Sequence, residues 1–293
     1  MRAAMRAVGA FHRSVGRSFA AARPKPLRYA LLDVDGVCIL GGAEIPGSAQ
    51  ALAKLRSSVR ACRFITNQSQ EPCSVVQGNL RGAGFHVGDG EIFSALRAAR
   101  HFVKQRKLRP LCLLSSAAME EFRDVAQEEP NAVVVGTAPE HMHYERLTEA
   151  MRVLQASEDS HLIAVNKGRY FQRDDGLALQ AGPFVAALEF ATGKTATVVG
   201  KPDWEFFHSA VEDASGATGT SNDLPLGDFV MIGDDVIDDV QGAMRAGMRA
   251  ILVKTGKYRA GDELRLATPP LAVVDSLEHA VDFLQAEGLL DGR

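Results

Sequence analysis

The sequence predicts an α/β protein in which a doubly wound, Rossmann-like parallel sheet is interrupted by a second, inserted α/β domain. From Arg28 onward, short apolar runs alternate with amphipathic stretches of helical spacing, a rhythm typical of parallel strands covered by helices on both faces. The same rhythm returns after Lys194, and a further set of strands and helices lies between the two blocks. We therefore expect residues 28–86 and 195–293 to form the core domain and residues 87–194 to form the inserted domain.

The two outer blocks supply the elements of the core. Strands are expected where apolar residues run together, at 29–34, 62–67, 195–200, 228–234 and 248–253. Helices are expected where apolar residues recur at helical spacing, at 48–59, 74–85, from Pro202 onward, at 240–247 and at 276–288. Pro202 suits a helix start, since its missing N–H is harmless there, and the acids that follow it suit the helix dipole.

The inserted block repeats the alternation on a smaller scale. Its strands are expected at 111–116, 131–136 and 161–166. Its helices are expected at Ile92–Gln105, Ala118–Ala126, Tyr144–Ala156 and Pro183–Thr192.

Composition excludes several classes of protein. With 293 residues, 46% of them hydrophobic and 24% charged, the chain is long enough for two domains and too apolar to be disordered. Its apolar runs fall well short of eighteen residues, so we expect no membrane insertion. The four cysteines form no CxxC pair, which argues against a zinc module, and the net charge of −3 argues against nucleic-acid binding.

The N-terminal segment is strongly basic. It is rich in Arg, Ala and Ser, carries no acid before Asp33, and places Phe11, Val15 and Phe19 on one helical face. Such a segment is typical of a mitochondrial transit peptide, and the alternative is a basic tail on a cytoplasmic enzyme. We expect residues 1–27 to lie outside the fold.

Two acids follow the first strand. Asp33 and Asp35 come directly after an apolar run, where carboxylates need a cation or a raised pKa. Gly36 permits a tight turn that would direct backbone N–H groups at an anion. The alternative for this DxDG motif is a solvated turn at a strand end.

Polar residues also follow two other expected strands. Thr66 and Asn67 end the second one, where a hydroxyl and N–H groups can bind a phosphate oxygen, or where they only cap a helix. Lys201 stands between a strand and a helix, where it can offset charge on an anionic transition state or simply be a surface lysine.

Four further carboxylates lie within six residues. Asp234 ends the apolar strand and is followed by Asp235, Asp238 and Asp239. These charges repel one another unless a cation is near, and oxygen ligands of this kind suit Mg²⁺. Asp235 and Asp238 are the ones we expect to act only as helix caps.

Ligands of doubly wound sheets bind beyond the carboxyl ends of the strands, where all of these motifs fall. The order DxDG, Thr, Lys, GDxxxxD resembles the haloacid dehalogenase (HAD) superfamily. A receiver domain fits poorly, because its acidic pair precedes the phosphorylated aspartate, and a P-type ATPase needs membrane helices. A true dehalogenase lacks the second aspartate.

Motif spacing locates the insertion. Only 33 residues separate Asp33 from Thr66, whereas 135 separate Thr66 from Lys201, so the inserted domain lies in the second interval. This resembles class IIA of the superfamily, which carries an α/β (C2-type) cap there. The resemblance extends from about Leu27 to Gly288. The branch that it resembles most carries serine where this chain has Asp35, so this chain keeps a general acid that the branch lacks.

The resemblance implies a phosphatase that hydrolyses a small phosphomonoester through an aspartyl-phosphate, with pyrophosphate and phosphoamino acids among the candidate substrates. It implies Asp33 as nucleophile and Asp35 as general acid and base. It implies that Mg²⁺ is held by Asp33, by the carbonyl of Asp35 and by Asp234, with Asp239 as a supporting acid. It also implies a set of residues that bind the phosphate, namely Gly36, Thr66, Asn67 and Lys201. Two alternatives stay open, a binding protein that has lost turnover and a phosphotransferase.

Substrate choice is expected to come from the inserted domain. A loop with His141, flanked by Glu140, Met142 and His143, matches the family's specificity loop, although it could equally cap the helix that starts at Tyr144. Lys167, Arg169 and Tyr170 form a second candidate, with a basic surface turn as the alternative. The resemblance also implies a homodimer.

Overall fold

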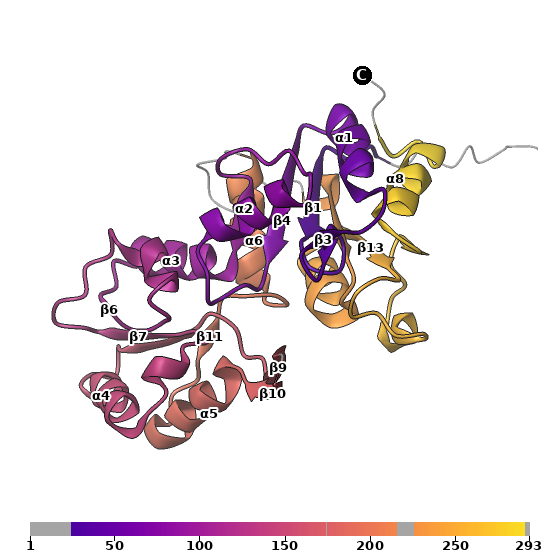
Figure 1. Ribbon diagram of the computed structural model, residues 1–293. Coiled ribbons are helices and arrows are strands. Elements are labelled where there is room, and N and C mark those ends of the chain that lie inside the picture. The colour runs from indigo at the N-terminus through magenta and orange to yellow at the C-terminus, as the bar shows by residue number, and fades with distance from the viewer. Residues whose placement is uncertain (1–24, 174, 216–225, 291–293) are drawn as a thin grey trace, which may run out of the picture.

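A computed structural model describes residues 25–173, 175–215 and 226–290, which form two α/β units, one above the other in Figure 1. We name them by their sheets, the six-stranded unit and the four-stranded unit. Among the described residues, no helix combines the length and the apolar character needed to cross a membrane.

The six-stranded sheet is parallel throughout and has the order β14-β13-β12-β1-β4-β5. Its strands are β1 (Tyr29–Asp33), β4 (Ala61–Thr66), β5 (Ile92–Ser94), β12 (Phe229–Gly233), β13 (Arg249–Val253) and β14 (Ala272–Val274). The order reverses beside β1, because the chain first builds outward through β4 and β5 and later through β12 to β14. This confirms the predicted α/β class and places a topological switch point next to β1.

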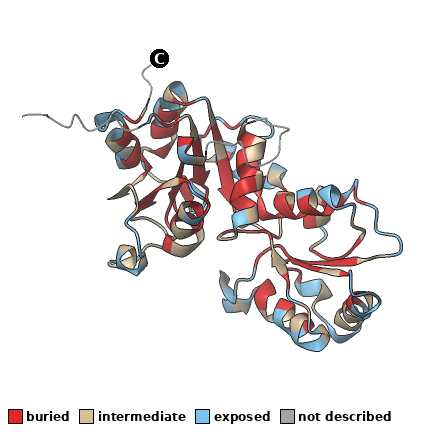
Figure 2. Ribbon diagram, turned by 180° about the vertical axis from the view of Figure 1, so that it is seen from behind, coloured by how far each residue is buried: buried red, intermediate tan, exposed pale blue. Residues whose placement is uncertain are grey.

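Helices cover both faces of this sheet. One face packs against α1 (Ser48–Ser58), α2 (Cys73–Gly82) and α8 (Leu277–Ala286), the other against α6 (Trp204–Ser215) and α7 (Gly242–Arg245). Successive residues of β1 alternate between the two, since Ala30 and Leu32 pack with α1 and α8 whereas Leu31 packs on the α6 side. Figure 2 shows the buried strands between helices whose outer sides are exposed.

The second sheet has the order β11-β8-β7-β6 and is also parallel. Its strands are β6 (Pro110–Leu113), β7 (Ala132–Val135), β8 (His161–Ala164) and β11 (Thr197–Val198). Helices α4 (Tyr144–Gln155) and α5 (Ala181–Thr192) cover its lower face in Figure 1, and α3 (Ala95–Gln105) lies against the other face. Two antiparallel hairpins complete the strands, β2 (Ile39–Leu40) with β3 (Ala43–Glu44), and β9 (Tyr170–Arg173) with β10 (Gly176–Leu179).

The sheets divide the chain a few residues away from the predicted boundaries at 87 and 194. Ile92–Ser94, predicted as the start of a helix, is β5 and pairs with β4 in the six-stranded sheet. Thr197–Val198, predicted for the core, is β11 and pairs with β8 in the four-stranded sheet. Strands of two or three residues are too short for periodicity to reveal them.

Three predicted helices also differ in detail. The helix expected from Pro202 begins at Trp204, and the carboxylate of Asp203 accepts a hydrogen bond from the N–H of Glu205. The region expected as a helix at Ala118–Ala126 contains the 3-10 helix η1 (Ala118–Phe122), and that at 240–247 is a π-helical turn, η5 (Val236–Gln241), followed by α7. Short 3-10 helices also occur at η2 (Pro139–His141), η4 (Leu226–Asp228) and η6 (Asp262–Arg265).

The folded part begins earlier than the predicted residue 28. Leu27 is 1% exposed, and its N–H donates to the carbonyl of Leu289. Lys25 lies 2.6 Å from the buried carboxylate of Asp228. The predicted targeting segment, up to residue 24, lies outside the described residues.

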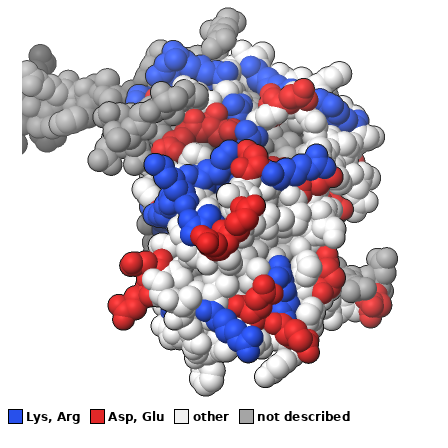
Figure 3. All heavy atoms as spheres, turned by 90° about the vertical axis from the view of Figure 1, so that its left-hand side faces the viewer, with Lys and Arg blue, Asp and Glu red and all other residues white. Residues whose placement is uncertain are grey.

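The surface carries both signs of charge close together (Figure 3). On α3, Arg100 and Lys104 both pair with Asp124, at 2.5 and 2.6 Å. Arg63 and Arg97 share Asp213 in the same way. These arginines are therefore compensated locally.

Candidate active site

Three neighbouring strands of the six-stranded sheet end at one edge, and each brings a polar residue there. β1 ends at Asp33, β4 ends at Thr66, and Asp234 follows directly after β12. Because β12, β1 and β4 are adjacent and parallel, their carboxyl ends meet. Lys201 reaches the same edge from the segment that follows β11.

Lys201 joins two of the acids. Its Nζ lies 2.6 Å from Oδ1 of Asp33 and 2.6 Å from Oδ1 of Asp239, and all three side chains are buried. Burial alone would lower the pKa of Lys201, but the carboxylates of Asp239 and Asp33 outweigh it and raise this pKa. The lysine is therefore a fixed positive charge beside Asp33.

One positive charge does not balance this cluster. Ligand oxygens of Asp33, Asp234 and Asp239 all lie within 4.8 Å of one another. Burial, followed by repulsion from Asp33 and Asp239, raises the pKa of Asp234 to about 8. Burial and repulsion from Asp33 raise the pKa of Asp239 to about 6, although Lys201 opposes the shift.

The donor atoms of this cluster suit a divalent cation. Oδ1 of Asp234 is buried and has no hydrogen-bond partner among the described residues, whereas Oδ2 accepts from the N–H of Lys257 at 2.6 Å. A buried carboxylate oxygen without a partner is costly, and a cation would satisfy it. All of the donors are hard oxygens, which fit Mg²⁺.

Two glycines allow this crowding. Gly36 has φ +92°, and a Cβ at this position would lie 2.1 Å from Oδ2 of Asp234. A Cβ at Gly256, on the facing loop, would lie equally close to the same oxygen. The hydroxyl of Thr255 donates to the carbonyl of Gly36 and ties the two loops together. The N–H of Gly36 donates to the carbonyl of Ile39, at 2.7 Å. That N–H is thus engaged within the turn, where Gly36 also provides space for Asp234, and the role of Gly36 in phosphate binding stays a prediction.

The side chain of Asn67 is also engaged differently from the prediction. Its Oδ1 accepts from the N–H of Lys201 at 2.8 Å, and its Nδ2 donates to the carbonyl of Lys201 at 3.0 Å and to Asp238 at 3.3 Å. The amide thus holds the backbone of Lys201 from both sides, and the role of Asn67 in phosphate binding stays a prediction. Thr66 is 4% exposed, and its Oγ1 accepts from the N–H of Gln68.

The remaining acids separate into different roles. Asp35 lies at the exposed side of the site, and partial desolvation raises its pKa despite the nearby charges of Lys201 and Lys257. Asp235 accepts from two N–H groups at the start of η5 and is a helix cap, as expected. Asp238 is not a cap, since its carboxylate faces Asn67, and its pKa is raised to about 6 by burial and by Asp235 and Asp239.

A cavity of about 780 Å³ opens beside Lys201. Of the residues predicted for substrate contact, Lys167 and Tyr170 line it, whereas Arg169 does not. Glu140, His141, Met142 and His143 lie elsewhere: Glu140 accepts from the N–H of Ser116, and His143 pairs with Glu145 at the start of α4. The side chain of His143 makes no cap hydrogen bond to that helix.

Sequence reasoning missed several residues of this cavity, notably Trp204, Arg245, Lys257 and Asn166. They come from four separate loops and helices, so no local spacing relates them. Lys257 has only a weak signal, because it follows Gly256 in the loop after an apolar strand, four residues beyond the last strand residue, Val253.

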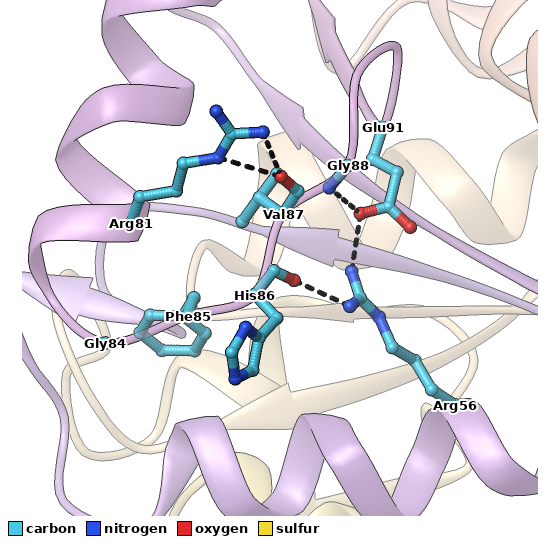
Figure 4. A pocket seen from close by; sticks show the side chains of 8 residues that line it. All are labelled: Arg56, Arg81, Gly84, Phe85, His86, Val87, Gly88 and Glu91. Carbon is cyan, nitrogen blue, oxygen red and sulfur yellow. Dashed lines mark hydrogen bonds and ion pairs between the residues drawn. The ribbon is translucent and has the colours of Figure 1, made fainter.

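A second cavity, of about 650 Å³, lies between α1 and α2 on the core face away from the site (Figure 4). Its arginines already have partners: Arg56 donates to the carbonyl of His86 and to Glu91, and Arg81 donates to the carbonyl of Val87. Both arginines of this second cavity are therefore engaged within the protein.

Comparison with known families agrees with this geometry. Residues 30–128 match a family model described as haloacid dehalogenase-like hydrolase, and residues 198–280 match one described as HAD-hydrolase-like. The chain is 44% identical over 260 residues to haloacid dehalogenase-like hydrolase domain-containing protein 2 of Mus musculus, covering 89% of this chain and 96% of the relative. It is 40% identical over 262 residues to phospholysine phosphohistidine inorganic pyrophosphate phosphatase of Bos taurus, covering 88% and 94%.

Solved structures show the same architecture. A p-nitrophenyl phosphatase from Archaeoglobus fulgidus superposes with a TM-score of 0.78 at 26% identity, covering 88% of this chain and 100% of that one. A glycerol phosphate phosphatase from Mycobacterium tuberculosis in complex with magnesium gives 0.73 at 25% identity, covering 87% and 76%.

Proposed function

Because this chain belongs to the haloacid dehalogenase-like hydrolases and is a phosphatase, we propose that it hydrolyses a small phosphomonoester with the help of Mg²⁺ and through an aspartyl-phosphate on Asp33. The observation that carries the proposal is the buried cluster in which Lys201 bridges Asp33 and Asp239 next to Asp234.

Asp33 is the nucleophile in this scheme. Its carboxylate attacks phosphorus in line, and the bond from phosphorus to the leaving oxygen breaks. Lys201 fixes the orientation of Asp33 at 2.6 Å and places positive charge where the phosphoryl oxygens arrive. Asp239 in turn holds Lys201 from its other side.

Asp35 handles the protons. Its carboxyl lies at the exposed side of the site, and desolvation raises its pKa, which is the direction that a donor to the leaving oxygen requires. Once it has lost that proton, the carboxylate accepts one from the water that hydrolyses the aspartyl-phosphate. The phosphate and a regenerated Asp33 carboxylate are the products.

Asp33, Asp234 and the carbonyl of Asp35 would hold the Mg²⁺ ion. When bound, Mg²⁺ supplies the positive charge that lets a carboxylate approach a phosphate dianion. The partnerless Oδ1 of Asp234 and its pKa of about 8 support this assignment.

The test compares the wild-type chain with Asp33→Asn in phosphate release from p-nitrophenyl phosphate, with Mg²⁺ and with EDTA. We expect release only with the metal, and a loss of more than roughly 10³-fold in kcat for Asp33→Asn, since the nucleophile is gone. Asp159→Asn, at an exposed aspartate in the loop between α4 and β8, is the matched control and should keep full activity. When the reaction of the wild type is quenched with acid, we expect a phosphorylated protein whose phosphate is released by hydroxylamine, as an aspartyl-phosphate requires. If Asp33→Asn became phosphorylated in the same way, Asp33 would not be the nucleophile.

A further inference from the structure

The cavity beside Lys201 carries two large aromatic side chains that are open to solvent. Trp204, the first residue of α6, is 47% exposed, and Tyr170, on β9 of the other unit, is 55% exposed. Both line the same 780 Å³ cavity as Lys201 and Asn67. Exposed aromatic surface inside a concave site is typical of a ligand pocket.

Trp204 is held in place from within the protein. Its ring packs against that of His208, tilted by 35° with centroids 4.3 Å apart, and His208 is only 6% exposed. His208 lies 3.8 Å from Glu212, one turn further along α6. One side of the indole is thus backed by a buried ring, and its exposed part borders the cavity in a preset orientation.

A buried amide on the same cavity wall lacks a partner. Asn166 is 3% exposed, and its Oδ1 accepts from the N–H of Gly168. Its Nδ2 has no hydrogen-bond partner among the described residues. Buried donors are normally satisfied, so a rotation of this amide toward the cavity, which Asn166 lines, would let Nδ2 donate to an acceptor atom of a ligand.

We propose that the leaving group of the substrate is a planar aromatic ring that stacks on Trp204 and carries an acceptor atom toward Asn166. The substrate class is then a phosphomonoester of an alcohol that carries a planar aromatic ring. This inference rests on the proposed function for the chemistry at Asp33, and it identifies the kind of alcohol that the reaction releases.

A direct binding test uses the fact that Trp204 is the only tryptophan of the chain. The full chain with Mg²⁺ is titrated with benzylphosphonate and with cyclohexylmethylphosphonate, which cannot be hydrolysed and differ only in the flatness of the ring. We expect a saturable change in tryptophan emission and binding about fivefold to tenfold tighter for the aromatic ligand, the size of an aromatic pair. Equal affinities would overturn the proposal.

A kinetic test compares benzyl phosphate with cyclohexylmethyl phosphate, whose leaving alcohols are of one chemical class. Trp204→Leu should raise KM for benzyl phosphate roughly tenfold at unchanged kcat and leave the cyclohexyl substrate within about twofold. Trp204→Phe should restore most of the loss. The control is Phe190→Leu, an exposed aromatic on α5 that does not line the cavity. Equal losses on both substrates would assign Trp204 to packing alone and refute the inference.

The two failures are distinguishable. If benzylphosphonate binds preferentially and perturbs Trp204 but no phosphate ester is hydrolysed, the proposed function fails and the pocket assignment stands. If p-nitrophenyl phosphate is hydrolysed and the two ring types are treated alike, the pocket assignment fails and the function stands.

Discussion

Asp234 is an acid whose negative charge the described residues compensate poorly. Its pKa of about 8 means that the metal-free fold favours the protonated form. Because this pKa lies above the unfolded value of about 4, the stability that it contributes is full below that value and is lost as the pH rises through about 8. A cation competes with this proton, so metal binding should strengthen over the same range.

The prediction is that Mg²⁺ raises Tm more at about pH 9 than at about pH 6, measured by calorimetry against EDTA-treated protein. Asp234→Asn should remove this difference and should itself be more stable than the wild type at high pH without metal, since the repulsion is gone. The same Mg²⁺ increment at both pH values would contradict the assignment of Asp234 as the proton-linked ligand.

Asn67 offers a second test at this scale, because its side chain holds the backbone of Lys201 at 2.8 and 3.0 Å. Asn67→Ala should lower kcat by roughly tenfold to a hundredfold, because small displacements of a catalytic group are costly, and should leave KM nearly unchanged. The fold should lose only about 1 kcal/mol. Asn79→Ala, on the exposed side of α2, is the control. A change confined to KM would mean that Asn67 contacts substrate directly.

The turn η5 is the element that connects β12 to the rest of the site. Asp235 begins it and accepts hydrogen bonds from the N–H groups of Ile237 and Asp238, at 2.9 and 3.0 Å. The turn then directs Asp239 back to Lys201. Asp235→Ala should reduce the free energy of unfolding by about 0.5–2 kcal/mol in urea titrations, and Asp235→Ser should recover most of it. No difference between Ala and Ser would show that the cap contributes little here.

Element-level prediction succeeded where the physical signal was local. The strands that carry Asp33, Thr66 and Asp234 are runs of buried apolar residues, and parallel strand ends must meet, so their proximity follows from the sequence. The strands β5 and β11 were missed because two or three residues carry no period. The role of Asn67 was missed because its partner lies 134 residues away, and only the fold brings them together.

At the scale of the whole molecule, one hydrophobic cluster joins the two units. It includes Leu31 and Phe206 of the six-stranded unit and Val134 and Ile163 of the four-stranded sheet, with α3 between them. Because one continuous cluster spans both units, we expect them to unfold together in a single transition. The units therefore depend on each other for stability.

Ile163→Ala tests this coupling, since it should cost about 2–5 kcal/mol, against about 0.5–1.5 for Ile163→Val. The expected result is a lower urea midpoint reported by Trp204 fluorescence, although Trp204 belongs to the other unit, and the same midpoint by circular dichroism. Two separated transitions, with Trp204 unaffected by the substitution, would show that the units are independent.

The direction of β1 has a practical consequence. This strand runs from the junction where Leu27 meets Leu289 to Asp33, the proposed nucleophile, so its two ends lie on opposite edges of the sheet. The described parts of both chain ends lie at the junction, on the side of the six-stranded unit far from the other unit (Figure 1). A tag, a fluorescent fusion or a surface linkage joined next to residue 25 or residue 290 is therefore held away from the candidate active site, and an enzyme immobilised there should turn over its substrate as the free one does.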